Sequence, residues 1–445
     1  MPYKKPSSSY YSVLMATAVA SFITPFTTSS IAIALPIIAE EFKVTLAEVN
    51  WVANSFLVAL ASAVLIAGRV GDWLGRGRIF VIGTAMFVAT SLAMLIVNSF
   101  EGLLACRFLQ GVSAAMISGT AVAVLTDALP KEKRGMGIGI NTASVYLGLS
   151  LGPLIGGYFT SYLGWRSLFM LKAAISFLSL IVAVKSVDLG RGLFHHPNFL
   201  RSMLIASSIT MIVYGTSNIS SSYGLATAFL GGILLIVTLL MEFKSSKLLH
   251  PVILRSRSLA ANTAALLNYS ATYALTILLS AYLQKIRSLT PSETGLILTT
   301  QSVFQAVFSP IAGSLADRYN PSTLASLGML VITAGVFSLT FIGQGTPTIY
   351  LIYALIVLGV GFAFFASPNT TAIMNMSPRE AYGSATAFLA TMRFLGQALS
   401  VSIITSAMIL QKDLMTAMRT SLTTYFVLSI LGTLLSLLAR GSTGY

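Results

Sequence analysis

Fourteen long apolar segments constrain what this chain can fold into more than any other feature of its sequence. They start near Ser12, Val49, Ile79, Gly102, Met136, Ser167, Phe199, Gly224, Leu259, Ser292, Thr323, Ile349, Ala381 and Thr420. A helix needs about 20 apolar residues to cross a bilayer, and each segment is long enough to do so. The connections between them are short, which leaves no room for a separate soluble domain. We therefore predict an all-α polytopic membrane protein.

The composition excludes a water-soluble globule. Hydrophobic residues make up 55% of the chain and charged residues only 9%, so too few polar side chains exist to cover a solvated surface. The first segment follows Lys4 and Lys5 and lacks a small-residue cleavage site. We expect it to be a retained span rather than a signal peptide.

Basic residues fall mainly on one side of the predicted membrane. Of the 27 Lys and Arg residues, 18 lie on the side of both termini and three lie within spans. The other six lie on the opposite side, namely Lys43, Arg166, Lys285, Arg287, Lys412 and Arg419. Cytoplasmic loops are enriched in Lys and Arg, so we expect cytoplasmic termini in a plasma (inner) membrane. The net charge of +14 then reflects topology and not nucleic-acid binding.

The chain repeats itself. The segment from Gly68 to Arg78 joins two apolar segments, and a similar segment from Gly313 to Arg318 follows 245 residues later. The fifth and thirteenth spans also correspond, at an offset of 248. These matches predict two pseudo-symmetric six-helix halves, residues 1–187 and 258–445, with two extra helices in residues 188–257.

Four motifs resemble the major facilitator superfamily, and within it the 14-helix drug:proton antiporters of the EmrB/QacA type. The Gly68 to Arg78 loop resembles the loop after the second helix of that superfamily. The segment from Leu103 to Gly111 is similar to the fourth-helix motif, with Arg107 as its arginine. Gly148 to Gly157 resembles the fifth-helix signature of antiporters. Features at Trp165 to Phe169 and at His250 to Leu254 resemble the 14-helix branch.

The resemblance implies the major facilitator fold and a secondary transporter that exports small amphiphilic compounds, multidrug type, by alternating access. At the end of the second span, Asp72 can meet the positive end of the thirteenth helix near Arg379, and the recurrence at Asp317 favours a cytoplasmic gate over an ordinary positive-inside loop with a turn. The candidate gate residues are Gly68, Asp72, Gly75, Arg76, Arg78, Asp127, Gly313, Asp317 and Arg318. The resemblance also implies that a glycine stripe faces the second half. That stripe consists of Gly148, Gly152, Gly156 and Gly157, interrupted by Pro153.

Thr27 departs from the family pattern. The family typically has an Asp at this position of the first helix, and that carboxylate links export to the proton gradient. The thirteen acidic residues of the chain all lie near the ends of the predicted spans, so none replaces it. Proton antiport is therefore expected from the family, while the coupling group is left open.

Three basic residues lie within predicted spans. An intramembrane charge costs at least about 2.5 kcal/mol on insertion scales, so Arg107, Lys172 and Arg393 need partners. One hypothesis is a positively polarised cavity that favours anionic amphiphiles. The alternative is that the two arginines bond backbone carbonyls and polar side chains as packing elements, while Lys172 reaches outward. If Lys172 instead faces the cavity, it is a candidate proton carrier.

Polar residues on the other cavity-lining spans complete a candidate substrate site. They are Asn54, Gln110, Asn141, Tyr146, Asn268, Tyr269, Tyr273, Gln301, Gln305 and Gln397. As a set they suggest a broad, mainly apolar pocket with few fixed polar contacts. Each one alone is also compatible with an ordinary interhelical hydrogen bond.

The sequence is also compatible with other functions. An anion or metabolite carrier, facilitative or coupled through a group other than a carboxylate, remains open. A non-transporting sensor or scaffold is disfavoured by the antiporter motif and the two gating loops. Cys106 is the only cysteine, and His195, His196 and His250 show no metal-ligand spacing with it, so we expect no metal, no cofactor and no enzymatic activity. The expected partners are the bilayer, a small substrate and protons, and the chain is expected to work as a monomer.

Overall fold

The computed structural model describes residues 9–130, 133–190, 192, 199–245, 251–378, 381–411 and 413–440. This part of the chain is helical, and 14 of its helices are long and apolar enough to cross a membrane, which confirms the predicted number. The sequence predictions for Lys4, Lys5, His195, His196, His250, Arg379 and Lys412 fall outside the described residues.

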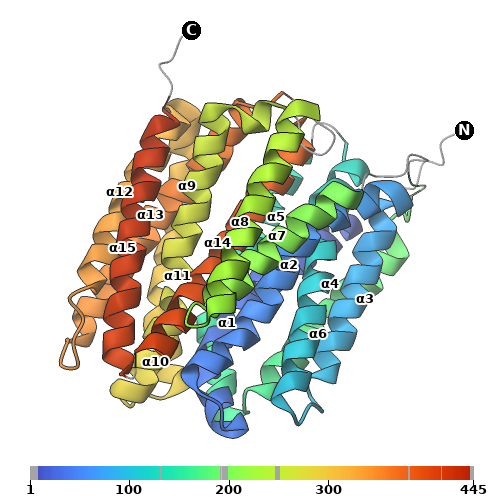
Figure 1. Ribbon diagram of the computed structural model, residues 1–445. Coiled ribbons are helices and arrows are strands. Elements are labelled where there is room, and N and C mark those ends of the chain that lie inside the picture. The colour runs from blue at the N-terminus through green and yellow to red at the C-terminus, as the bar shows by residue number, and fades with distance from the viewer. Residues whose placement is uncertain are drawn as a thin grey trace, which may run out of the picture.

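The helices form one elongated bundle (Figure 1). We call the first six spans the first half: α1 (Ser9–Phe42), α2 (Leu46–Leu74), α3 (Arg76–Ala93), α4 (Phe100–Ala128), α5 (Arg134–Tyr162) and α6 (Arg166–Ser186). Two helices follow, α7 (Phe199–Ser217) and α8 (Ser222–Ser245), and then a short 3-10 helix, η2 (Pro251–Leu254). We call the remaining elements the second half: α9 (Ser256–Thr272), α10 (Leu275–Ala281), η3 (Tyr282–Ile286), α11 (Pro291–Arg318), α12 (Pro321–Leu339), α13 (Thr348–Asn375), α14 (Tyr382–Leu410) and α15 (Leu414–Leu438).

The two halves start their second helices with the same turn. Thr45 caps α2 in a capping box with Glu48, and Thr290 caps α11 in the same way with Glu293. Two residues before each cap, the backbone adopts a positive φ, 55° at Lys43 and 54° at Ser288. Each of these pairs is separated by 245 residues, the offset of the sequence repeat.

Close helix contacts are repeated as well. A Cβ on Gly111 of α4 would lie 2.3 Å from the carbonyl oxygen of Phe56 in α2. A Cβ on Gly359 of α13 would lie 2.3 Å from the carbonyl oxygen of Gln301 in α11. The glycines are 248 residues apart and the carbonyls 245, so the same helix pair is built twice with the same backbone approach.

The ninth span is interrupted in its middle. Residues Ser256–Ile286 form one span composed of α9, α10 and the π-helical η3. At the break, the Ser400 hydroxyl of α14 accepts a hydrogen bond from the backbone N–H of Ala274 (2.9 Å). Ser400 is held in turn, because its carbonyl accepts from the Tyr425 hydroxyl (2.7 Å). A side chain inserted into the backbone ladder is a recognised cause of a helix break.

Each end of the bundle carries an ion pair after which we name it. We call them the Glu41 end, where Arg166 pairs with Glu41 (2.5 Å), and the Asp72 end, where Arg76 pairs with Asp72 (2.8 Å). The start of α1 and the end of α15 lie at the same end of the bundle (Figure 1). At the start of α1, the Tyr10 hydroxyl accepts from Lys133 Nζ (2.7 Å), and this bond raises the pKa of the lysine above its ordinary value.

The two extra helices pack beside the seam between the halves. Helix α7 contacts α2 of the first half and α14 of the second half, while α8 packs mainly on α7. Arg201 of α7 and Glu242 of α8 form an ion pair in which the glutamate side chain is fully buried. Helix α7 is thus the element of the hairpin that touches both halves.

Candidate functional site

Arg107 lies at the core of the first half. Its side chain is fully buried in α4. Nε donates to the carbonyl of Val52 (2.8 Å), and Nη1 donates to Gln110 Oε1 (2.6 Å). The guanidinium also lies 4.5 Å from the ring centroid of Phe56, while Nη2 has no hydrogen-bond partner among the described residues. These contacts fit the alternative in which Arg107 is a packing element, and they leave its Nη2 without an acceptor among the described residues.

Lys172 of α6 is also fully buried. The alternative that it reaches outward is therefore wrong. Its Nζ has no hydrogen-bond partner among the described residues and lies 4.6 Å from the ring centroid of Phe169. Arg107 is close enough to interact with it electrostatically. Two buried basic side chains thus share this region.

Thr27 and Tyr273 border the same region. Thr27 of α1 is fully buried, and its hydroxyl has no partner within the described part of the chain. The next residue, Thr28, accepts a hydrogen bond on its carbonyl from the Tyr273 hydroxyl (3.3 Å) at the α9 break. Tyr273 is also within electrostatic range of Arg107. The interruption of the ninth span therefore brings the second half against the Arg107 region.

Arg393 belongs to a second group, which lies between the halves. Its guanidinium lies 5.1 Å from the ring centroid of Tyr269, and its Nε has no hydrogen-bond partner among the described residues. Tyr269 packs edge-on against Phe362 at 5.3 Å. Tyr146 of α5 interacts electrostatically with both Arg393 and Tyr269. This group combines aromatic faces with one partly exposed cation, which suits an amphiphile.

Asn54 lies elsewhere, at a junction of three helices. Its Nδ2 donates to Ser217 of α7 (3.0 Å) and to Ser402 of α14 (3.2 Å), and it is buried. Ser217 also donates to Ser402 (2.8 Å). This polar junction joins α2, α7 and α14, so the interhelical role weighed from sequence accounts for Asn54.

The remaining predicted polar residues are not linked to one another by hydrogen bonds in the described part of the chain. Gln301 is partly exposed on α11. Four others are buried and each has at least one amide atom without a partner in that part, namely Asn141, Asn268, Gln305 and Gln397. A buried amide atom without a partner is costly, so these positions are candidates for contacts with substrate or water.

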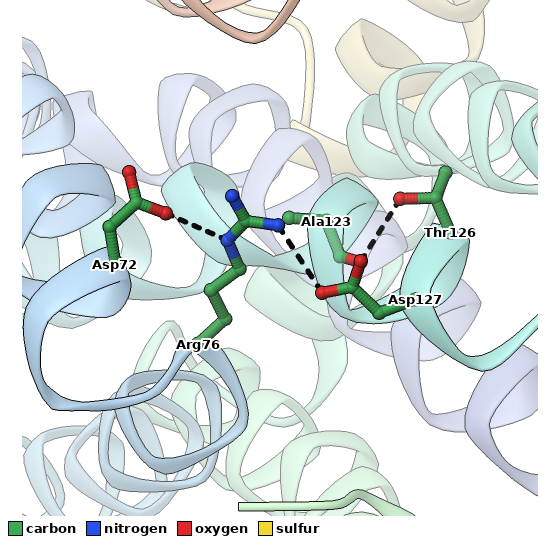
Figure 2. A network of polar contacts seen from close by, with 5 residues as sticks. All are labelled: Asp72, Arg76, Ala123, Thr126 and Asp127. Atoms are coloured by element: carbon green, nitrogen blue, oxygen red, sulfur yellow. Dashed lines mark hydrogen bonds and ion pairs between the residues drawn. The ribbon is translucent and has the colours of Figure 1, made fainter. Parts of the chain in front are cut away.

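Three of the predicted gate residues, Asp72, Arg76 and Asp127, form an ion network at the Asp72 end (Figure 2). Arg76 Nε donates to Asp72 Oδ1 (2.8 Å), and its Nη1 donates to Asp127 Oδ2 of α4 (3.2 Å). Gly75 separates α2 from α3 with φ of 107°, where an added Cβ would also lie 2.4 Å from the carbonyl oxygen of Leu189. Only glycine fits such a turn without strain.

The other gate residues have fewer contacts in this conformation. Asp72 pairs with Arg76 of its own half, and its predicted contact with the start of the thirteenth span stays a prediction. Gly68 faces the backbone of Gly119, and Gly313 faces the side chain of Ser367, both at ordinary contact distance. Arg78, Asp317 and Arg318 are exposed, as are Arg76 and Asp127 of the ion network.

The glycine stripe of α5 faces two directions. Added Cβ atoms on Gly148 and Gly156 would lie 2.3 and 2.7 Å from carbonyl oxygens of Phe22 and Ser30 in α1. One on Gly152 would lie 1.8 Å from the Ser29 hydroxyl. The expectation that the stripe faces the second half is therefore wrong for these three glycines. They recur every four residues and share one face of the helix, which packs within the first half.

Gly157 provides the contact that the sequence assigned to the whole stripe. An added Cβ there would lie 2.4 Å from the carbonyl oxygen of Pro291 and 3.1 Å from Cα of Gly295, both in α11. A Cβ on Gly295 would in turn lie 2.4 Å from the carbonyl oxygen of Pro153. Gly157 lies about 100° around the helix from Gly156, because an α-helix has 3.6 residues per turn. The adjacent face of α5 therefore meets the second half.

Several contacts join the two halves between the Glu41 end and the middle of the bundle. Glu40 of α1 forms an ion pair with Lys285 of η3. Gln284 Nε2 donates to the carbonyl of Ile33 (3.0 Å), and the backbone N–H of Ser292 donates to the Ser161 hydroxyl (2.9 Å). At the Asp72 end the start of α5 is exposed on several faces, with Met136 48%, Ile138 41% and Ile140 40% exposed.

The sequence predictions did not single out Glu40 and Lys285. Both were placed at the outer boundary, but no pairing was proposed. A signal was present, because the two positions are 245 residues apart, the offset of the repeat. Equivalent positions of two halves related by a pseudo-two-fold axis meet when they lie next to that axis.

Comparison with known proteins decides the family. The sequence profile described as Major Facilitator Superfamily matches residues 17–258 and 261–443, nearly the whole chain. The chain belongs to this superfamily. Its members are membrane transporters and not enzymes, and the fold predicted from sequence is that of the family.

Individual relatives are distant but cover most of the chain. The riboflavin transporter RibZ of Clostridioides difficile is 27% identical over 404 residues, covering 88% of this chain and 87% of its own. The tetracenomycin C resistance and export protein of Streptomyces glaucescens is 27% identical and covers 84% of this chain and 71% of its own. The puromycin resistance protein pur8 of Streptomyces alboniger is 29% identical, and the match covers 84% of this chain and 76% of pur8.

Proposed function

We propose that this major facilitator transporter exports small amphiphilic compounds by alternating access. The observation that carries the proposal is the uneven distribution of contacts between the halves. The pair of Glu40 with Lys285 and the close approach of Gly157 to α11 hold the halves together toward the Glu41 end. The start of α5 is exposed at the Asp72 end. We infer a conformation that is closed at the Glu41 end and open at the Asp72 end.

The moving units in this proposal are the two six-helix halves, residues 1–187 and 258–445, with residues 188–257 as an inserted hairpin. Rocking of one half against the other would break the contacts toward the Glu41 end and form new ones near Asp72. The positive-inside distribution of charge makes the Asp72 end cytoplasmic. Substrate would then enter from the cytoplasm in the conformation described here.

The Arg393 group is the proposed substrate site. It offers the aromatic faces of Tyr269 and Tyr146 and one cation, and it lies between the halves, where both conformations can reach it. An apolar pocket with few polar contacts accepts amphiphiles of varied shape. The names of the distant relatives, which include a riboflavin transporter and antibiotic export proteins, support this substrate class.

A second candidate function is the carriage of anions. The observation in its favour is that Arg107, Lys172 and Arg393 have no acidic partner among the described residues. An anionic substrate would supply the missing counter-charge.

The test is transport in proteoliposomes that contain the purified protein, with three fluorescent probes side by side: cationic ethidium, neutral riboflavin and anionic fluorescein. The proposal predicts gradient-driven movement of at least one probe that protein-free liposomes do not show. Movement of fluorescein alone would favour the anion carrier. If none of these probes or further amphiphiles moves under any imposed gradient, the proposal is wrong.

A further inference from the structure

Lys172 is a buried titratable group with no assigned partner, and its surroundings can be traced. Two anchors set the register of α6 against α1. At the Glu41 end, Glu41 accepts from Trp165 Nε1 (2.6 Å) and pairs with Arg166. Farther along α6, Ser179 donates to the carbonyl of Ala16 (2.8 Å). Lys172 lies between these anchors, and it therefore faces the middle of α1.

The middle of α1 is unusually rich in hydroxyl groups without partners. Thr24, Thr27 and Ser30 are buried there, and none of their hydroxyls has a hydrogen-bond partner among the described residues. Ser176, one turn beyond Lys172 on α6, is in the same situation. Hydroxyls can both donate and accept, so this strip could carry a proton when water enters it.

Aromatic side chains close the region toward the Glu41 end. Phe169 packs edge-on against Trp165 with ring centroids 5.9 Å apart, and Phe42 lies 6.1 Å from Trp165 and 6.0 Å from Phe100. Lys172 is six residues, about 9 Å, from the start of α6, so these rings lie between its amine and that end. Glu41 holds the Trp165 ring in place.

The charged groups around Lys172 are few. Helices α1, α3 and α5 pack against α6, and α4 contributes Arg107. The carboxylates on the described parts of these helices lie in their terminal turns, at Glu40, Glu41, Glu101 and Asp127. The other ionisable groups on these helices are the tyrosines of α5, the arginines at the start of α3 and α5, Cys106, and the tyrosines at the start of α1. A charged ammonium at Lys172 would thus meet Arg107 and no carboxylate.

We propose that Lys172 is the group that binds and releases the coupling proton. The inference rests on the proposed transport function. In the conformation described here, Nζ is sealed from water and has no acceptor among the described residues, so the neutral amine is the form that fits. When the Glu41 end opens, water reaches Nζ, and a hydronium ion there gives its proton to the nitrogen lone pair, which forms an N–H bond and leaves water. During the return to the present conformation this N–H bond breaks, the proton passes through water among the Thr27 and Thr24 hydroxyls toward the Asp72 side, and the neutral amine is sealed again.

This sequence of steps produces antiport. The conformation that releases the proton toward the Asp72 end is also the one in which substrate enters the Arg393 group. Proton uptake accompanies the conformation that opens toward the Glu41 end, where substrate leaves. One amine therefore performs the coupling without any carboxylate in the transport path.

Trp165 provides a direct readout, because its ring packs against Phe169, and the Phe169 ring centroid lies 4.6 Å from the Lys172 amine. In a variant carrying Trp51→Phe and Trp73→Phe, Trp165 is the single tryptophan. We expect its fluorescence in detergent-solubilised protein to change in a single cooperative transition when the pH is varied. Lys172→Gln should abolish the change and give the high-pH spectrum, and Lys172→Arg should abolish it and give the low-pH spectrum. Lys185→Gln, an exposed lysine of the same helix, should leave the change intact.

Two results would overturn the proposal: no transition in the parent, or a transition that survives Lys172→Gln. Lys172→Met replaces the glutamine variant if the latter does not fold. The titration needs no substrate, so it is independent of the transport assay. Where a probe is transported, Lys172→Gln should keep probe exchange at equal pH but lose accumulation driven by a pH gradient. Retained pH-driven accumulation would also overturn the proposal.

Discussion

Glu40 and Lys285 form an ion pair across the two halves, and they occupy equivalent positions of the internal repeat. Thr28 and Tyr273, also 245 residues apart, meet in the same way farther into the bundle. Equivalent residues can touch only beside the pseudo-two-fold axis, so these two pairs mark that axis between α1 and the ninth span. We call the ion pair of Glu40 with Lys285 the latch, since it joins the two halves at the Glu41 end.

Breaking this latch should favour opening at the Glu41 end. The side chains are 62% and 32% exposed, and partly exposed ion pairs contribute about 0.2 to 1 kcal/mol, so Glu40→Gln should shift the equilibrium by up to roughly fivefold. The measurement is the maleimide labelling rate of a cysteine at Ile37, in a Cys106→Ser background. Swapping the charges with Glu40→Lys and Lys285→Glu should restore the slow rate. Equal rates in all three proteins would contradict the latch.

Gly148 and Gly157 should respond differently to the same substitution. Alanine at either would place Cβ 2.3 or 2.4 Å from a carbonyl oxygen, but Gly148 meets α1 of its own half and Gly157 meets α11 of the other. Overpacking costs about 1 to 3 kcal/mol. Gly148→Ala should therefore lower the thermal unfolding temperature, whereas Gly157→Ala should raise the labelling rate at Ile37 with a smaller change in unfolding. Identical effects of the two variants would contradict the claim that Gly148 contacts only its own half while Gly157 contacts the other half.

The direction of these glycine faces illustrates what the sequence could reveal. Four-residue spacing defines a face of α5, and it predicted close helix contact correctly. It contains no information on which helix lies opposite, so three of the four glycines were assigned to the wrong neighbour. The number of spans was predictable because each apolar segment is a local property. The surroundings of Lys172 and the hydrogen-bond partners of Asn54 depend on how helices far apart in sequence pack, and periodicity does not report that.

Asn54 should stabilise the bundle rather than bind substrate. It joins α2 to Ser217 and Ser402, and interhelical hydrogen bonds in membrane proteins contribute about 0.6 kcal/mol on average. We expect Asn54→Ala and Ser402→Ala to lower thermal stability, with a double variant less destabilised than the sum of the two. Probe selectivity should not change. A change in the ratio of ethidium to fluorescein transport in Asn54→Ala would place this residue in the pocket after all.

Arg393 should influence which probes are moved. It is the partly exposed cation of the group between the halves, and a hydrogen bond to a charged group contributes about 1.5 to 3 kcal/mol. Arg393→Gln should therefore lower fluorescein transport relative to ethidium by roughly tenfold or more. Arg419→Gln, at an exposed arginine of α15, serves as the control and should leave the ratio unchanged. An unchanged ratio in Arg393→Gln would remove Arg393 from the substrate site.

The most direct test of the central claim is proton flux induced by substrate. Proteoliposomes containing the parent protein and an internal pH dye are given a pH gradient, and ethidium, riboflavin or fluorescein is then added. The account predicts that at least one probe dissipates the gradient in the parent, and that Lys172→Gln, which still exchanges that probe at equal pH, does not. Probe movement in the parent with no accompanying proton flux would contradict coupled export and favour a facilitative carrier.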